Sequence, residues 1–359
     1  MKFSLFVHME RLDADQSHQS LYDEFIELCL MADRGGMSAI WTGEHHGMDF
    51  TIAPNPFINL ADLARRTTNV RLGTSTVIAP FWHPIKLAGE AAMTDIITGG
   101  RLDIGIARGA YNFEYQRLVP GLDPVKAGLR MRELVPAIKG IWAGDYAHNG
   151  ETWSFPATTS APKPIQDPHP PLWIAARDPS SHDFAVANGC NVQVTPLALG
   201  DEEIESLMQR FNDACANHPE MARPKIMLLR HTYVGSDEGD IAQAAKEISV
   251  YYNYFGAWFK NEKPVTQGLI ERLTDDEMAE SPAYAPEVIR SNTVVGTAEE
   301  VIGRLKHAEK LGYDEYSMWI DTGMSFERKR QSLQRFIDEV MPAFASPSEG
   351  NSEGANAQA

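Results

Sequence analysis

Short apolar runs of strand length alternate along the chain with longer segments of helical pattern. The predicted strands are Lys2–Val7, Ala39–Thr42, Arg71–Val77, Leu102–Ala107, Leu172–Ala176, Asn191–Val194, Ile226–Val234 and Glu315–Ile320. The predicted helices are Ser20–Arg34, Pro56–Thr67, Pro84–Ile97, Pro124–Ala143, Ser181–Asn188, Glu202–Asn217, Asp240–Phe255, Ala298–Leu311 and a closing helix, Ser325–Met341.

Eight strand-then-helix units predict a (β/α)8 TIM barrel. A doubly wound open sheet is the alternative, but it usually has fewer units and a glycine-rich first turn. The first turn here, His8–Gln19, contains no glycine. We therefore expect one barrel domain over residues 1–344. Residues 345–359 are rich in Ser, Gly, Asn and Ala, which predicts a disordered tail.

Two segments interrupt this alternation. Residues 146–170 contain Asn149-Gly150 between Tyr146 and Trp153, which is a hairpin signal, and then a proline-rich connection. Residues 256–292 form a long, polar, aromatic-rich segment after the seventh strand. Because barrel active sites lie at the C-terminal ends of the strands, we expect this second insertion to act as a lid over that mouth.

Composition limits the possible partners and the compartment. A formal charge of −17 disfavours nucleic acid and anionic membrane surfaces, because both bind basic faces. The three cysteines are odd in number and lack metal-type spacing, and no signal peptide is recognisable, so we expect a cytoplasmic protein. No apolar stretch approaches the roughly 18 residues needed to span a bilayer.

Candidate phosphate-binding residues follow two neighbouring strands. Arg108 ends the strand Leu102–Ala107, and its planar guanidinium suits phosphate. After the next predicted barrel strand, Pro179, Ser180 and Ser181 begin a helix, where free N–H groups and the helix dipole attract anions. Asp178 opposes this interpretation, since its carboxylate repels phosphate unless it turns back to cap its own helix.

The run Glu44-His45-His46 follows the second strand. Imidazoles and a carboxylate are good ligands for zinc or iron, but adjacent strand residues point to opposite faces. We therefore expect no metal site. A single histidine that acts as a hydrogen-bond donor or general base is the favoured interpretation, and a structural role for both histidines stays open.

Together these residues resemble the bacterial luciferase-like flavin monooxygenase family. The resemblance covers residues 1 to about 341. Its motifs are Glu44–His46, Gly73–Thr76 followed by Pro80 and His83-Pro84, G-R-x-x-x-G-x-x-R-G-x-Y-N from Gly100 to Asn112, Pro171–Ala176, and V-G-T-x-E-E at Val295–Glu300 with Gly312-Tyr313-Asp314.

The resemblance implies a barrel enzyme that binds reduced FMN (FMNH2) supplied by a separate flavin reductase. The family reacts it with O2 and uses the resulting flavin hydroperoxide to oxygenate a small organic substrate. A dry pocket under the lid suits that chemistry, and its candidate aromatic lining is Phe6, Trp41, Phe81, Trp82 and Tyr111. We also expect a homodimer.

The resemblance also assigns site residues by position. His45 corresponds to the family's catalytic histidine, Arg108 to its phosphate-binding arginine and Ser181 to its phosphate-binding hydroxyl. Ser75-Thr76 falls where the family commonly has a non-prolyl cis peptide under the isoalloxazine ring. The other expected flavin-binding residues are Ala107, Tyr111, Ala176, Arg177 and Asp178.

Two departures from the family change these expectations. Ala107 replaces a reactive cysteine of luciferases, and Arg177-Asp178 replaces a Glu-Ser pair. Because the Asp178 carboxylate repels phosphate, we expect Arg177 to supply a compensating positive charge. Both departures weaken the expectation of light emission or of an aldehyde substrate. Three alternatives stay open: a deazaflavin (F420)-dependent oxidoreductase on the same barrel, a metal-dependent hydrolase, and flavin binding without catalysis.

Overall fold

The computed structural model describes residues 1–261 and 263–345. Eight parallel strands close into a barrel, in which β8 pairs with β9 and β13 pairs with β1. In barrel order they are β1 (Lys2–Phe6), β2 (Ala39–Thr42), β3 (Arg71–Ile78), β4 (Leu102–Ala107), β7 (Leu172–Ala175), β8 (Asn191–Val194), β9 (Ile226–Val234) and β13 (Glu315–Trp319). The predicted (β/α)8 barrel is confirmed.

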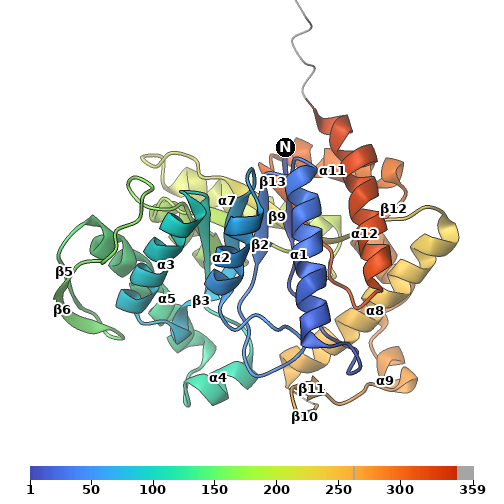
Figure 1. Cartoon of the computed structure of the whole chain (residues 1–359), viewed down its shortest axis with the longest axis horizontal. Coiled ribbons are helices and arrows are strands. Elements are labelled where there is room, and N and C mark those ends of the chain that lie inside the picture. The colour runs from blue at the N-terminus through green and yellow to red at the C-terminus, as the bar shows by residue number, and fades with distance from the viewer. Residues whose placement is uncertain (262, 346–359) are drawn as a thin grey trace, which may run out of the picture.

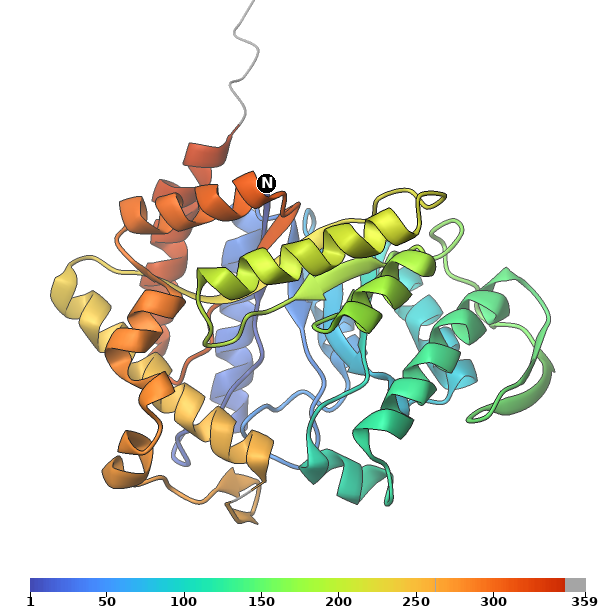
Figure 2. The ribbon, with the colours of Figure 1, turned by 180° about the vertical axis from the view of Figure 1, so that it is seen from behind.

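Helices surround the barrel (Figures 1 and 2). The long ones are α1 (His18–Arg34), α2 (Pro56–Arg66), α3 (Pro84–Thr98), α5 (Pro124–Ala143), α6 (Pro179–Ala187), α7 (Asp201–Asn217), α8 (Glu238–Lys260), α11 (Ala298–Leu311) and α12 (Phe326–Arg335). Side chains of Ser17, Asn55, Asp123 and Asp178 accept N–H groups at helix starts. These caps explain why the predicted helix starts lie within two residues of the observed ones at these four helices.

Two tryptophans fill the barrel interior between its N-terminal end and the cavity described below. Trp41 and Trp173 contact each other edge to face, with ring centroids 5.3 Å apart. Their indole N–H groups donate to the buried carboxylates of Glu315 and Asp103, each over 3.0 Å. A Cβ at Gly73 would lie 2.2 Å from the Trp41 ring, so only glycine leaves room for it. These side chains fill the N-terminal part of the barrel interior, so the cavity lies at the C-terminal end.

The first insertion has the predicted form. Strands β5 (Tyr146–Asn149) and β6 (Ser154–Thr158) pair as an antiparallel hairpin that projects from one side of the molecule in Figure 1. The connection that follows contains two cis prolyl peptides, Ala161–Pro162 and Asp167–Pro168.

The second insertion differs from its predicted boundary. Helix α8 continues through Gly256 to Lys260, so the first residues of the expected lid are helical. Gly256 lies inside this helix and does not end it. A Cβ at Gly256 would lie 3.1 Å from the Tyr284 ring, so the glycine allows α8 to pack closely against Tyr284. The segment then forms β10 (Val265–Thr266), β11 (Leu269–Ile270), α9 (Asp275–Ala279), η2 (Pro282–Tyr284) and α10 (Pro286–Asn292), followed by β12 (Val294–Gly296), which pairs with β9.

Two further elements differ from the prediction. A seven-residue helix, α4 (Asn112–Leu118), follows β4 directly and was not expected. The predicted closing helix is divided into α12, a π-helical turn η3 (Phe336–Val340) and η4 (Met341–Phe344). The predicted tail lies outside the described residues apart from Ala345. In the described part of the chain, no helix has the length and apolarity needed to cross a bilayer.

Candidate active site

A cavity of about 370 Å³ opens at the C-terminal end of the barrel. Every barrel strand, or the loop that follows it, contributes to its wall, as expected for a barrel active site. The residues that line it are Phe6, His8, Glu44, His45, Ser75, Thr76, Ile78, Ala107, Arg108, Gly109, Ala110, Tyr111, Ala175, Ala176, Arg177, Gln193, Val194, Thr195, Leu197, Leu229, Phe255, Phe259 and Trp319. This set includes His45 and seven of the nine predicted flavin-binding residues.

The part of the wall formed by β3, β4 and β7 suits a flat ring. The Ser75–Thr76 peptide is cis, as the resemblance implied. It lies where the pairing of β3 with β4 is interrupted, between Thr74 and Val77. The neighbouring strand ends carry only methyl side chains, Ala107 and Ala176. A planar ligand can therefore approach this backbone closely.

Two arginines line the cavity side by side at the ends of the neighbouring strands β4 and β7. The Arg108 side chain is exposed and donates only to the carbonyl oxygen of Pro124, over 3.3 Å. Arg177 is also exposed, and its carbonyl oxygen accepts from Arg210 over 2.6 Å. Among the described residues neither arginine forms an ion pair. Both guanidinium groups are thus free for an anionic ligand.

Asp178 and Ser181 do not line the cavity. Asp178 Oδ1 accepts from the backbone N–H of Ser181 over 3.0 Å and from the Ser180 hydroxyl over 2.6 Å. Burial opposes ionisation, but these hydrogen bonds prevail and lower the pKa of Asp178. The Ser181 hydroxyl donates to the Asp178 carbonyl and accepts from the Arg177 N–H. Asp178 thus caps its own helix, and the hydroxyl predicted to bind phosphate is already engaged.

His45 is held by a buried carboxylate. Its Nδ1 lies 3.1 Å from Oε1 of Glu114, a residue of α4 that is 1% exposed. The same oxygen accepts from the backbone N–H of His46 over 2.8 Å. Because this oxygen is an acceptor, Nδ1 of His45 is the donor of this hydrogen bond, and Nε2 takes no part in it. The hydrogen bond therefore fixes the orientation of the His45 ring at the cavity wall.

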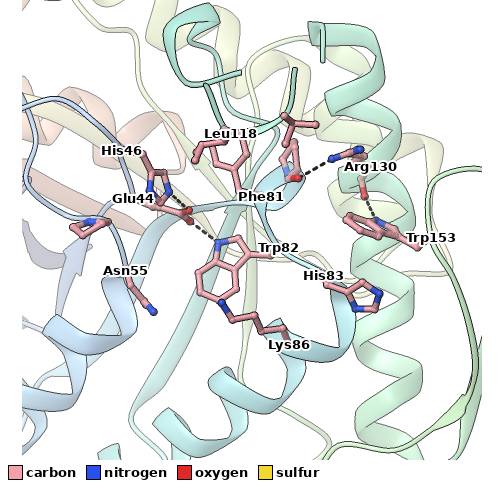
Figure 3. A pocket seen from close by; sticks show the side chains of 13 residues that line it. Glu44, His46, Asn55, Phe81, Trp82, His83, Lys86, Leu118, Arg130 and Trp153 are labelled. Atoms are coloured by element: carbon pink, nitrogen blue, oxygen red, sulfur yellow. Dashed lines mark hydrogen bonds and ion pairs between the residues drawn. The ribbon is translucent and has the colours of Figure 1, made fainter. Parts of the chain in front are cut away.

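His46 faces a different pocket, of about 430 Å³ (Figure 3). Its Nε2 lies 2.7 Å from Oε1 of Glu44, and Oε2 of Glu44 accepts from the Trp82 indole over 2.8 Å. Burial lowers the pKa of His46, but the hydrogen bond and charge of Glu44 outweigh burial and raise it. The two adjacent histidines thus point to different pockets and bind different glutamates, although both lie beyond the end of β2 and strand alternation is not the reason.

Comparison with known proteins identifies the family. A family model described as "Luciferase-like monooxygenase" matches residues 1–315. The chain belongs to the luciferase-like monooxygenase family. It is 68% identical over 345 residues, 96% of each chain, to the "flavin-dependent trigonelline monooxygenase, oxygenase component" of Acinetobacter baylyi.

Solved structures of other monooxygenases share this barrel. A monooxygenase from Streptomyces bottropensis superposes with a TM-score of 0.81 at 25% identity, covering 96% of this chain and 100% of that one. The oxygenating constituent of 3,6-diketocamphane monooxygenase from Pseudomonas putida, in complex with FMN, superposes with a TM-score of 0.75 at 18% identity, covering 95% and 98%. The comparisons confirm the predicted fold and the class of flavin-dependent monooxygenase.

In this luciferase-like monooxygenase, helix α8 covers His45. Trp258 stacks on Tyr111 with ring centroids 3.7 Å apart and an interplanar angle of 7°. It also contacts the His45 ring over 4.9 Å. Trp258 itself is 3% exposed, whereas Phe259, next to it on the same helix, is 50% exposed and lines the cavity rim. The cover of the candidate site is thus a helix face and not a loop.

Sequence reasoning assigned some side chains to the wrong pocket and missed others. Phe6 and Tyr111 line the cavity as predicted. Phe81 and Trp82 line the pocket of His46 instead, and Trp41 lies below the cavity. The sequence analysis gave no active-site role to Glu114, His8 or Trp258. His8 had a usable signal, because it follows the strand adjacent to the one that leads to His45.

In the described part of the luciferase-like monooxygenase, no group of three His, Cys, Asp or Glu residues is arranged to hold a metal ion.

Proposed function

We propose that this chain is the oxygenase component of a two-component monooxygenase that acts on trigonelline or a closely related N-methylated pyridine carboxylate. The 68% identity to the trigonelline monooxygenase oxygenase component, over 96% of both chains, carries this proposal. Bound reduced FMN supplies the activation of O2. One oxygen atom enters the substrate, and the other leaves as water.

The cavity has two chemically different sides that support this assignment. Arg108 and Arg177 lie at the ends of β4 and β7, where they would hold the FMN phosphate. Phe6 and Trp319, from β1 and β13 on the opposite side of the barrel, contact each other with ring centroids 5.2 Å apart. Trigonelline is a flat ring with a methylated, positively charged nitrogen, and aromatic faces attract such cations.

The experiment that tests the function measures product and oxygen together. The purified chain is supplied with FMN, a flavin reductase, reduced nicotinamide cofactor and ¹⁸O2. We expect trigonelline to yield a product with one ¹⁸O atom, and we expect nicotinate, which lacks the methyl cation, to yield far less. A deazaflavin-dependent oxidoreductase would form product only when reduced deazaflavin replaces FMN, and that product would carry no ¹⁸O. Flavin capture without product would indicate a flavin-binding protein, and either result would refute the proposal.

The cofactor's phosphate provides a second test. Replacing Arg108 with alanine removes a charged donor that faces the cavity, so FMN binding should weaken by about 10- to 100-fold while riboflavin binding changes little. Fluorescence titration of both flavins measures the difference. Arg34→Ala, at the exposed end of α1, is the matched control. Equal losses for FMN and riboflavin would show that Arg108 does not bind the phosphate.

Reduced flavin would come from a separate reductase, as the name of the Acinetobacter relative indicates for that protein. Such a reductase draws on reduced nicotinamide cofactors of the cytoplasm. The thiols of Cys29, Cys190 and Cys215 are free, which is consistent with a reducing compartment. We therefore place the proposed activity in the cytoplasm.

We also propose that the chain forms a homodimer. Helices α2 and α3 pack side by side, and Ile58, Met93 and Ile96 on them are 66%, 47% and 41% exposed. Exposed apolar side chains on two paired helices favour a protein interface, and the occupant proposed here is a second copy of this chain. Ile58→Glu combined with Met93→Glu should give a monomer in light scattering. Val125→Glu on α5, where Val125 is 74% exposed, should leave the dimer intact. A dimer that survives the double change would refute this surface.

A further inference from the structure

A second histidine faces the cavity beside His45. Strands β1 and β2 are parallel neighbours, so the residues that follow them converge. The His8 ring lies edge to face with the His45 ring, with centroids 4.8 Å apart and an interplanar angle of 70°. A Cβ at Gly43 would lie 2.6 Å from Nε2 of His8, so a glycine at this position makes room for the imidazole.

His8 also has a carboxyl partner, Glu10, which is 2% exposed and does not line the cavity. Nδ1 of His8 lies 3.3 Å from Oε1 of Glu10 and 3.4 Å from the Thr51 hydroxyl. Oε1 of Glu10 also accepts from the Trp319 indole over 3.2 Å. Oε2 is buried and has no hydrogen-bond partner in the part of the chain that the structure describes.

The surroundings of Glu10 favour its neutral acid form. The nearby Asp321 is 1% exposed, accepts from the backbone N–H of Met9 over 3.0 Å and pairs with Lys329 over 3.2 Å. An ionised Glu10 would place two carboxylates side by side in a buried site, which is costly although the nearby Tyr251 hydroxyl favours the ionised form. Burial, and then the charge of Asp321, raise the pKa of Glu10 well above its usual value.

His8 is neutral for a related reason. Burial lowers the pKa of His8 well below its usual value, and the neighbouring imidazoles of His45 and His231 act in the same direction, because two protonated rings at this distance would repel each other. A neutral imidazole therefore faces a neutral carboxylic acid. In the proton arrangement that we assign to this pair, the Oε1–H of Glu10 donates to Nδ1 and its remaining lone pair accepts from the Trp319 indole, while the proton of His8 resides on Nε2.

We propose that His8 and Glu10 form a second histidine–carboxyl pair of the active site, which donates a proton where the pair of His45 and Glu114 accepts one. This inference rests on the proposed function. Monooxygenation releases one oxygen atom of O2 as water, and that atom needs protons. The Nε2–H bond of His8 breaks as a new O–H bond forms on this oxygen. Nδ1 takes the Glu10 proton, which leaves Glu10 ionised until water restores the proton after product release.

In this assignment His8 is a catalytic residue and Glu10 a positioning residue that acts through it. The decisive variant is Glu10→Gln, because glutamine keeps the shape and an acceptor for Trp319 but carries no acid proton. We expect an unchanged melting temperature, unchanged FMN binding and O2 uptake, but about tenfold less product per O2, with hydrogen peroxide released instead. A merely structural role of Glu10 would instead lower the melting temperature or FMN binding together with the yield, as a packing change does.

Glu315 offers a matched control at the other end of the barrel. It is 6% exposed and accepts from the Trp41 indole, as Glu10 does from Trp319, but it does not line the cavity. Glu315→Gln should keep the product yield per O2 of the wild type.

The outcomes separate this inference from the proposed function. His8→Gln, with Glu10 intact, should show the same loss of yield and serves as the second test if Glu10→Gln lowers the melting temperature. A wild-type yield in a folded Glu10→Gln or His8→Gln variant would overturn the proton-donor role. A wild-type protein that forms no product from trigonelline would overturn the proposed function, and this inference with it.

Discussion

Replacing His45 with alanine is expected to lower product formation by about 100- to 10,000-fold, the range in which general acid–base groups contribute to catalysis. His45 lines the cavity, and Glu114 engages its Nδ1, so Nε2 is the nitrogen left for the reaction. Loss of the imidazole removes this nitrogen but leaves Arg108 and Arg177 in place. FMN binding should therefore stay close to that of the wild type, and stopped-flow product analysis measures the loss.

Variants of Glu114 test how His45 is held. Glu114→Gln keeps an oxygen that can accept from Nδ1 but removes the negative charge, so we expect a loss smaller than that of His45→Ala. Glu114→Leu removes the acceptor, frees the tautomer and should approach the His45→Ala result. His46→Gln is the matched control, because glutamine keeps a donor for Glu44 in the other pocket. Full product formation by His45→Ala would refute the role of His45.

The sequence was sufficient to predict the barrel and the residues at the ends of its strands. The eight apolar runs are buried on both faces in the parallel barrel, so their boundaries were readable. Arg108 and His45 follow strands directly, and their placement requires only the rule that barrel active sites lie at C-terminal strand ends. The cis Ser75–Thr76 peptide was predicted from the resemblance to the family, because nothing in the residue types Ser and Thr indicates a cis bond.

The contacts that position these residues depend on tertiary packing. Glu114 belongs to α4, a helix of seven residues that is too short for periodicity to reveal and is not stable alone. Gly256 resembles a helix breaker in the sequence, and only the neighbouring Tyr284 shows why α8 continues through it. Ser181 stays a predicted phosphate ligand, and hydrogen bonds at the start of its own helix engage its hydroxyl.

Replacing Trp258 with alanine is expected to damage both stability and coupling. A buried tryptophan truncated to alanine typically costs about 3–5 kcal/mol, and Trp258 packs on Tyr111, His45 and Phe50. Its removal also opens the cover over His45 to water, which interrupts oxygen transfer. We expect a lower melting temperature and, below it, more hydrogen peroxide and less product per O2 consumed.

Two variants of the same helix separate the causes. Trp258→Phe keeps a ring against Tyr111 and breaks no hydrogen bond, since the Trp258 indole N–H has no partner among the described residues. It should therefore retain most of the coupling. Phe259→Ala removes a side chain that is half exposed at the rim, so it should change the melting temperature little. Trp258→Ala with a wild-type product yield per O2 would show that the Trp258 side chain does not keep water from the reaction.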